Sequence, residues 1–231
     1  MALKADLDTY CYDTFLGRWE KRDGTVVPSD TSLKLSNDGI NLAATVLYAD
    51  LADSTVMVDK EIAGFAAEVY KSFLYCAAKI IRAFGGTITA YDGDRIMAVF
   101  IGDYKNTSAV KAALQINWAV KNIVQAQLKA VYKDKVFAVK HVVGIDTSDL
   151  LVARTGIRGS NDLVWVGRAA NYAAKLSALN HERPTYITAE VYNKLNDEAK
   201  LSAGIDMWKP YKWNTFDDRI IYGSTYSWTI A

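Results

Sequence analysis

The chain has 231 residues, of which 51% are hydrophobic and 23% charged, the composition of an ordinary globular protein. Its 27 basic and 26 acidic side chains leave a net charge of +1, so no overall field attracts it to nucleic acid or to an anionic membrane. No apolar segment approaches 18 residues without a charge, and the early Asp6 argues against a signal or transit peptide. We therefore expect a cytoplasmic protein with reduced cysteines and with no nucleic-acid or membrane partner.

Residues 1–41 differ from the rest of the chain, because they are polar and rich in turn formers such as Asp23-Gly24 and Asn37-Asp38-Gly39. We expect an N-terminal extension with one short helix around Tyr10 to Trp19, packed on the main domain or on a partner chain. The main domain should then cover residues 42–231.

The first part of the main domain is predicted to alternate strands with a long amphipathic helix. An unbroken apolar run is typical of a buried strand, and apolar residues at three- and four-residue spacing indicate a helix. The predicted elements are a strand Ala43–Ala49, a long helix with Asp53 or Ser54 as N-cap that Gly85-Gly86 stops, and a hairpin of Thr87–Tyr91 and Arg95–Ile101 around Asp92-Gly93-Asp94.

The second part repeats the alternation and then adds short strands. The predicted order β-α-β-β-α-β is that of a ferredoxin-like core, so the fold class is α+β with appended strands. The elements are a helix Thr107–Val131, a strand Val136–Ile145, a turn at 146–149, strands Leu150–Arg154 and Leu163–Val166 around a loop at 156–161, a helix 167–179, a strand Tyr186–Thr188, a short helix 189–195, and a hairpin of Trp208–Trp213 and Arg219–Tyr222.

Two carboxylates stand where this order of strands would present them together. Asp50 closes the apolar strand, and Asp94 lies in the turn of the following hairpin. A charge at the end of a wholly apolar strand needs a partner, and two such carboxylates can hold divalent ions against a triphosphate. Each motif also has a structural explanation, because Asp-Gly-Asp is a strong turn former and Asp53-Ser54-Thr55 is an ordinary helix cap.

A second polar pair lies on the predicted helix 167–179. Asn171 and Lys175 are four residues apart and share one helix face. An amide and an ammonium placed in this way can act together on a ribose and a phosphate in a transition state, although an ordinary solvated face also explains the spacing. Neither His141 nor His181 has a neighbour at metal-ligand spacing, and no phosphate-loop or nucleophile-elbow motif occurs.

Three motifs, taken in order, resemble those of a known family. They are Ala-Thr-Val-Leu-Tyr-Ala-Asp-Leu-Ala-Asp-Ser-Thr from Ala44, Gly-Gly-Thr-Ile-Thr-Ala-Tyr-Asp-Gly-Asp-Arg from Gly85, and Val-Gly-Arg-Ala-Ala-Asn-Tyr-Ala-Ala-Lys-Leu from Val166. Over residues 43–190 the chain resembles the class III nucleotidyl cyclases, whose corresponding motifs are Asp-Ile-x-Gly-(Phe/Ser)-Thr, Lys-x-x-Gly-Asp and Val-Asn-x-Ala-x-Arg.

The resemblance implies a role for each matching position in the first two motifs. Asp50 and Asp94, with the backbone carbonyl of Leu51, would bind two divalent metal ions, Mn²⁺ or Mg²⁺. Ser54 and Thr55 would open the helix that cradles the triphosphate. Asp53 replaces a glycine of the family motif, which implies an altered first helical turn.

In the third motif the resemblance implies that Asn171 orients the ribose and that Lys175 replaces a transition-state arginine. Lysine keeps the positive charge but loses the planar bidentate fork. Members of the family take the two carboxylates from one protomer and the Asn and Arg from the other. The resemblance therefore implies a homodimer with two shared sites.

The positions that select the base depart from the purine cyclases of the family. Adenylate cyclases use a Lys and an Asp, and guanylate cyclases Glu with Cys or Ser, where this chain has Ala90 and Val164. An apolar pair cannot read the edge of a purine by hydrogen bonding. This pattern, with Tyr48 two residues before Asp50, resembles the bacterial anti-phage pyrimidine (Pycsar) cyclases, and Tyr48 and Arg95 are our candidates near the base.

The narrower resemblance implies conversion of UTP, in preference to CTP, to the 3′,5′-cyclic monophosphate and pyrophosphate. The product would be a second messenger for a separate cyclic-nucleotide-binding effector in anti-phage defence. Two alternatives remain at this stage. One is an adenylate or guanylate cyclase with an unusual base pocket, and the other is a catalytically dead cyclase-like domain that binds a nucleotide.

Overall fold

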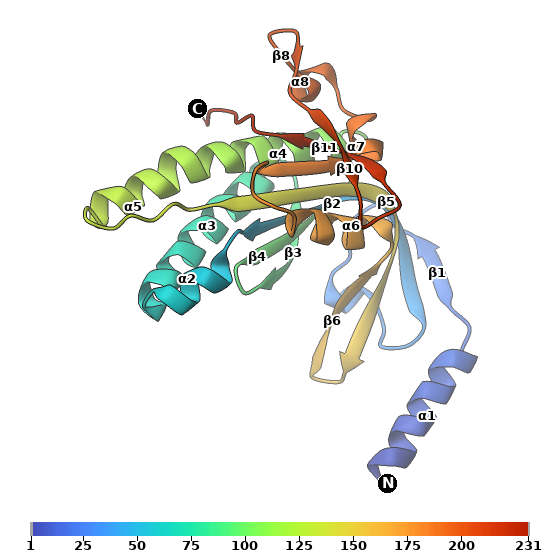
Figure 1. Cartoon of the computed structure of the whole chain (residues 1–231). Helices are drawn as coiled ribbons and strands as arrows, with labels where there is room; N and C mark the ends of the chain where they lie inside the picture. Colours follow the sequence, from blue (N-terminus) through green and yellow to red (C-terminus); the bar gives the residue numbers. More distant parts are fainter. Residues whose placement is uncertain (1, 231) are drawn as a thin grey trace.

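The computed structural model describes residues 2–230 and is built on one twisted nine-stranded sheet (Figure 1). Seven strands follow one path in the order β10-β11-β7-β5-β2-β4-β3, while β1 pairs with β2 and β6 with β5. The strands are β1 (Glu20–Asp23), β2 (Asp38–Leu51), β3 (Thr87–Asp92), β4 (Arg95–Phe100), β5 (His141–Ile157), β6 (Ser160–Val166), β7 (Thr185–Thr188), β10 (Lys209–Trp213) and β11 (Arg219–Ser224).

The four strands β5-β2-β4-β3 are antiparallel and form the predicted ferredoxin-like core. Helices lie on both faces of the sheet. The long helices pack on one face against side chains such as Leu47, Ala49 and Phe100, and α6 (Arg168–Ser177) packs on the other over β5 and β2. The long helices are α3 (Ala63–Ala83), α4 (Lys105–Ala119) and α5 (Gln125–Val131), the last two joined by the π-helical turn η2 (Val120–Val124). In residues 2–230 no helix is both long enough and apolar enough to cross a membrane.

Residues 2–41 form more structure than the sequence predicts. Helix α1 spans Leu3–Leu16 rather than a segment around Tyr10 to Trp19, and β1 pairs in parallel with β2. A single 3₁₀ turn, η1 (Asp30–Ser32), follows, and Leu33 is buried with the apolar side chains of β2. Strand β2 starts at Asp38 rather than Ala43, because this pairing extends it. The proposed domain boundary at residues 41/42 stays a prediction.

The predicted long helix after Asp53 is wrong in one respect, because it is broken into α2 (Ser54–Lys60) and α3. Glu61 and Ile62 between them have extended backbone angles, and the Glu61 carboxylate pairs with Lys135. This ion pair ties the break between α2 and α3 to the segment that follows α5. The predicted stop at Gly85 is confirmed, since Gly85 has a φ of 78°.

The predicted turn at 146–149 is also wrong, because β5 runs through it as one long strand from His141. Asp146 and Thr147 are buried and make side-chain hydrogen bonds, so their polarity marks an interior network rather than a turn. Residues 136–140 were predicted as strand but carry no regular structure. Near the C-terminus the predicted helix 189–195 is only α7 (Ala189–Tyr192), and the short elements α8 (Asp197–Lys200), β8 (Leu201–Ser202) and β9 (Ile205–Asp206) were not predicted.

Candidate active site

The carboxylate edge of the sheet, which we define as Asp50, Asp92, Asp94 and Arg95, lies where β2 ends beside the β3–β4 hairpin. Arg95 pairs across the sheet with Asp50 on β2 and with Asp92 on β3. Its Nε donates to Asp50 Oδ2 at 3.1 Å, and only 14% of the Asp50 side chain is exposed. The backbone therefore brings the two predicted metal-binding carboxylates to one place, with a guanidinium between the strands.

The electrostatics of this edge are unfavourable without a further cation. Burial, helped by the charges of Asp94 and Asp92 and opposed by Arg95, raises the pKa of Asp50 to about 6. One oxygen of Asp94, Oδ2, is buried without a hydrogen-bond partner. A buried acceptor of this kind costs free energy until a donor or a cation satisfies it.

The residues at this edge fit a divalent cation, because two carboxylates meet there and one of their oxygens is unsatisfied. Within residues 2–230 no group of three or more His, Cys, Asp or Glu side chains is arranged to hold a metal ion. The backbone carbonyl of Leu51, predicted as a further ligand, stays a prediction.

The predicted base pocket gathers beside the same edge. Tyr48 and Ala90 pair with the same residue, Met97, from the two sides of β4, and both pack in the apolar cluster under α6. Burial raises the pKa of the Tyr48 hydroxyl, Arg95 opposes this shift, and Asp92 adds to it, so Tyr48 lies close to both charges. Tyr48, Ala90 and Arg95 are therefore neighbours of Asp50 in the folded chain.

The first turn of α2 starts directly after the carboxylate edge. Asp53 holds the N-cap position in a left-handed conformation (φ 61°), but its side chain accepts no capping hydrogen bond. Its carboxylate faces Lys140 at 3.4 Å and His181 at 3.8 Å instead. The backbone N–H groups at Ser54 and Thr55 are consequently left without a side-chain cap.

The structure does not bring Asn171, Lys175 and Val164 to this edge within one chain. Asn171 Nδ2 donates to the Gly167 carbonyl at 3.3 Å, and Lys175 Nζ lies 4.9 Å from the ring centroid of Phe216. Val164 lies on β6 and is 38% exposed. Among residues 2–230 no hydrogen bond or ion pair joins any of these three to Asp50.

The position of α6 depends on close backbone contact with β5. A Cβ on Gly144 would lie 2.2 Å from the carbonyl oxygen of Ala173, and a Cβ on Gly167 would lie 2.8 Å from that of Asp149. Gly167 also has a φ of 156°, which few other residues adopt. These two glycines let the helix that carries Asn171 lie directly on the strand.

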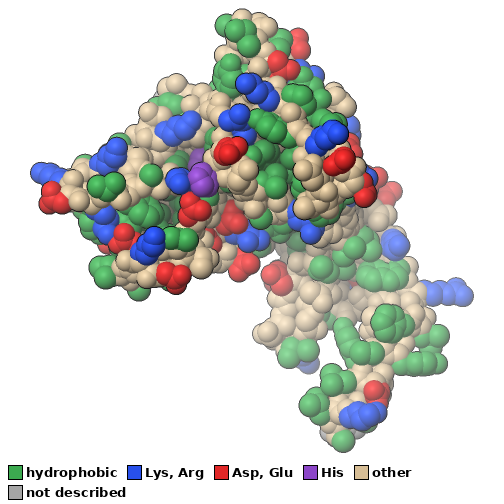
Figure 2. Space-filling view, in the orientation of Figure 1, with side chains coloured by type: hydrophobic (Ala, Val, Ile, Leu, Met, Phe, Trp, Pro, Cys, Tyr) green, Lys and Arg blue, Asp and Glu red, His purple; other side chains and the backbone are tan. Residues whose placement is uncertain are grey.

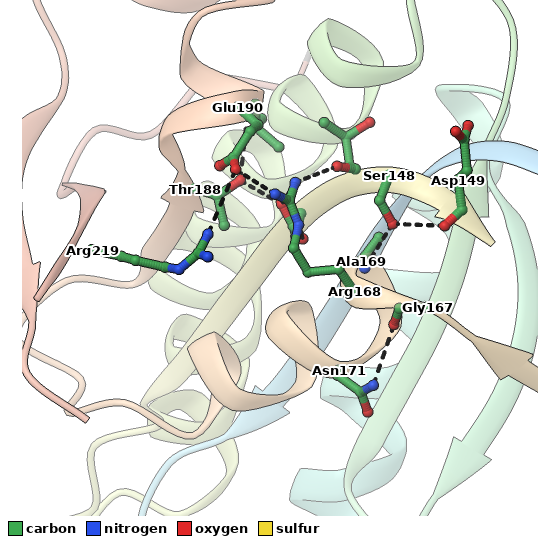
Figure 3. A network of polar contacts seen from close by, with 12 residues as sticks. Ser148, Asp149, Gly167, Arg168, Ala169, Asn171, Thr188, Glu190 and Arg219 are labelled. Carbon is green, nitrogen blue, oxygen red and sulfur yellow. Dashed lines mark hydrogen bonds and ion pairs between the residues drawn. The ribbon is translucent and has the colours of Figure 1, made fainter. Parts of the chain in front are cut away.

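A polar network at the start of α6 fixes the helix further (Figure 3). Arg168 donates from Nε and Nη2 to the two oxygens of the fully buried Asp146 at 3.0 and 3.2 Å, and Nη2 also donates to the Thr147 carbonyl at 2.7 Å. Thr188 donates to Asp146 at 2.6 Å, and Arg168 also pairs with Glu190. Neither Arg168 nor Asp146 was predicted to have a role. The available signal was an aspartate inside an apolar stretch, which needs a buried partner.

Comparison with known proteins agrees with this architecture. No protein-family profile matches the chain. The uridylate cyclase of Xanthomonas perforans is 55% identical over 231 residues, and that of Burkholderia cepacia is 55% identical over 234 residues. Both alignments cover 100% of this chain and 100% of the relative. The crystal structure of the adenylyl cyclase CyaB from P. aeruginosa has the same fold, with a TM-score of 0.68, 21% identity, and coverage of 80% of this chain and 95% of that one.

Proposed function

This chain belongs to the uridylate cyclases, within the class III nucleotidyl cyclases, and from that premise we propose that it converts UTP to 3′,5′-cyclic UMP and pyrophosphate. The observation that carries the proposal is the 55% identity to two uridylate cyclases over the full length of the chain. The meeting of Asp50 and Asp94 at one edge of the sheet supports it independently. CTP is the less favoured substrate.

Asp50, Asp94 and the Leu51 carbonyl would hold two divalent ions, Mn²⁺ or Mg²⁺. When bound, these ions would supply Lewis acidity to the ribose 3′-hydroxyl and neutralise charge on the leaving pyrophosphate. Arg95 already compensates part of the negative charge of Asp50. The uncapped start of α2 at Ser54 and Thr55 would donate N–H groups to the triphosphate.

The base would lie between Tyr48, Ala90 and Arg95, with Val164 contributed at its edge. Tyr48 and Ala90 flank Met97 at one register of the sheet, and the bulk of the Tyr48 phenol would leave room for a single pyrimidine ring rather than a purine. Arg95 can donate to a carbonyl oxygen of the base but cannot accept from an amino group, which favours uracil over cytosine.

In the reaction the ribose 3′-oxygen attacks the α-phosphorus, a new P–O bond forms, and the bond to the pyrophosphate oxygen breaks. The hydroxyl proton leaves to solvent. Asn171 would orient the ribose, and Lys175 would donate to the charge that builds up on the transferring phosphate. Since neither contacts the carboxylate edge of its own chain, both would be supplied by a second copy.

The substrate proposal is tested by incubating the purified chain with Mn²⁺ and each of ATP, GTP, CTP and UTP, with products identified by mass spectrometry. We expect cyclic UMP as the main product. Cyclic AMP or cyclic GMP would favour a purine cyclase with an unusual base pocket. No product from any of the four would favour a dead nucleotide-binding domain.

The shared-site proposal is tested by mixing two inactive variants, Asp50→Ala and Asn171→Ala. A heterodimer of the two contains one site with both wild-type halves, so about a quarter to a half of the activity should return on the symmetry argument alone. A mixture that stays as inactive as its components would rule out a site shared between protomers.

The proposal includes a biological role for the product. Cyclic UMP would act in the cytoplasm as a second messenger, bound by a separate effector, in defence against phage. The experiment is to induce the wild-type chain and the Asp50→Ala variant in cells and to compare cyclic UMP and plaque formation during infection. Equal plaque numbers despite a rise in cyclic UMP would remove the defence role and leave the enzymatic one.

A further inference from the structure

Helix α1 makes almost no contact with the rest of its own chain. None of its residues is buried, and Figure 1 shows it projecting away from the sheet beyond β1. Figure 2 shows green, hydrophobic side chains gathered along this projection. Phe15 is 88% exposed, more than any other aromatic side chain among residues 2–230. The large exposed apolar side chains of α1 and its root are Leu3, Leu7, Tyr10, Tyr12, Phe15, Leu16 and Trp19.

The root of α1 is nonetheless fixed in place by Asn37, the residue before β2. The Asn37 side-chain amide donates to the carbonyls of Thr14 and Gly17, both at 2.8 Å. The Glu20 N–H donates in turn to the Asn37 carbonyl at 2.8 Å. A Cβ on Gly17 would lie 3.0 Å from Asn37 Nδ2, so glycine keeps this joint tight. The helix therefore projects in a defined direction rather than hanging from a loose linker.

The sequence of α1 is apolar on two faces. Leu3, Leu7 and Tyr10 follow each other at helical spacing, and so do Tyr12 and Leu16. A 14-residue helix is marginal in water by its own backbone hydrogen bonds, and a helix that is apolar on more than one face is normally buried. Some surface outside this chain must therefore cover α1.

The charge and the exposed apolar area of α1 indicate what kind of surface covers it. Asp6, Asp8 and Asp13 outnumber its single lysine, Lys4, whereas helices that lie on membranes carry Lys and Arg on their polar face. The exposed apolar side chains offer on the order of 800 Å² of apolar surface, given that one aromatic side chain alone buries about 150–250 Å². A standard protein interface buries roughly 800 Å² per partner, so α1 has the area that one side of a stable dimer needs.

We infer that α1 packs against a second copy of this chain and strengthens the dimer in which the active sites are shared. The inference rests on the proposed function only in that the shared site already requires a second copy. By two-fold symmetry each copy gives one α1 and receives one. The N-terminal segment is then an assembly arm, and its loss would weaken the dimer without touching any residue of the site.

The test is a double variant of the full-length chain, Leu7→Glu with Phe15→Glu, studied by sedimentation equilibrium. Both side chains are exposed in the single chain, so the variant should keep its fold. We expect the dimer dissociation constant to rise at least tenfold, because two apolar contacts would be replaced by charges. The matched control is Val136→Glu, which places the same charge on a fully exposed valine outside any helix or strand and should leave the dissociation constant unchanged.

A dissociation constant equal to that of the wild type, or a wild-type chain that stays monomeric, would overturn the inference. A chain lacking residues 2–17 gives a second measurement, since it should show the same weakening without any new charge. Sedimentation needs no turnover. Failure to make cyclic UMP would therefore remove the proposed function while leaving the role of α1 open to the same measurement.

Discussion

The carboxylate edge and the network at the start of α6 each contain an aspartate on the same face of the sheet, but the two aspartates are satisfied to different degrees. Asp50 is 14% exposed and Asp146 is fully buried. Burial raises the pKa of both Asp50 and Asp146. Asp50 has one ion pair, to Arg95, and two further carboxylates beside it. Asp146 accepts hydrogen bonds from Arg168 on both oxygens and from Thr188.

The carboxylate edge is therefore suited to bind a ligand, whereas the network around Asp146 is suited to stabilise the local structure. The negative charge that stays uncompensated at the carboxylate edge can attract cations. In the folded chain without a metal ion this binding energy is not realised. The network around Asp146 leaves little charge to bind anything, but it fixes the helix that presents Asn171 and Lys175. The shared site that we propose would need both kinds of region.

The largest effect is expected at the unsatisfied edge. Asp50→Asn and Asp94→Asn should each lower UTP turnover by about 10³-fold or more, as loss of a group that supports transition-state charge does. Neither should lower the free energy of unfolding of the metal-free protein, because each removes one negative charge from an edge where several carboxylates lie together. Steady-state kinetics and urea unfolding measure the two effects.

Asp92→Asn is the control for this pair, since it removes a carboxylate from the same hairpin at an exposed position. It should keep turnover within a few-fold of the wild type. Full activity in Asp94→Asn would show that the buried, unpartnered oxygen has no part in catalysis.

In the network around Asp146, a substitution should lower the free energy of unfolding. Arg168→Ala leaves Asp146 buried without its ion pair, and breaking such a pair costs about 3 kcal/mol or more of unfolding free energy. Arg219→Ala is the control, because the exposed Arg219 lies 4.0 Å from Glu190 and, like Arg168, 5.6 Å from the ring centroid of Tyr172, but has no buried carboxylate partner among residues 2–230. It should cost less than about 1 kcal/mol. Equal stability of the two variants in urea would contradict the role given to the network.

The sequence allowed the core and the carboxylate pair to be predicted because local patterns determine them. The apolar run before Asp50, the turn at Asp92-Gly93-Asp94 and the stop at Gly85 each appear in the structure where they were expected. The order of helices and strands then fixes which strands are neighbours. The neighbourhood of Tyr48, Ala90 and Arg95 follows from the same register.

The missed features depend on partners that are distant in the sequence. Residues 146–149 resemble a turn until Arg168 and Thr188 are seen to satisfy Asp146 from other elements. The break at Glu61 depends on Lys135, more than seventy residues further along the chain. Local propensity carries no information about such contacts, so polar residues inside the fold were taken for surface loops.

The next smaller effect is expected on turnover, for substitutions on helix α6. Asn171→Ala should lower turnover by about 10²-fold, the typical loss when one oriented hydrogen-bond donor is removed from a transition state. Its amide donates to a carbonyl four residues earlier, and Asn122 does the same to Trp118 at 2.9 Å. Asn122→Ala is therefore a matched control for local helix stability and should leave turnover unchanged.

Lys175 provides a companion to this prediction. Lys175→Arg keeps the positive charge and adds a planar fork, so it should retain turnover within about tenfold, whereas Lys175→Ala should fall as far as Asn171→Ala. Equal activity of the alanine and wild-type chains would show that the α6 face is solvated rather than catalytic. Initial rates at saturating UTP distinguish these outcomes.

The smallest expected effect is on the free energy of unfolding and involves His141, which pairs with Leu51 next to the carboxylate edge. Burial lowers its pKa to about 3, with a contribution from Lys121, and its Nε2 has no hydrogen-bond partner. Below pH 6.5, the ordinary pKa of histidine, His141 binds a proton in the unfolded chain but stays neutral in the folded chain. The stability that the neutral His141 contributes to the folded chain is therefore complete above about pH 6.5 and is lost as the pH falls toward 3. From pH 7.5 to pH 5 the wild type should lose roughly 2 kcal/mol through this group. Urea unfolding of His141→Leu should show a flatter pH dependence over that range. Parallel pH profiles for His141→Leu and the wild type would mean that other groups cause the acid sensitivity and that His141 has no part in it.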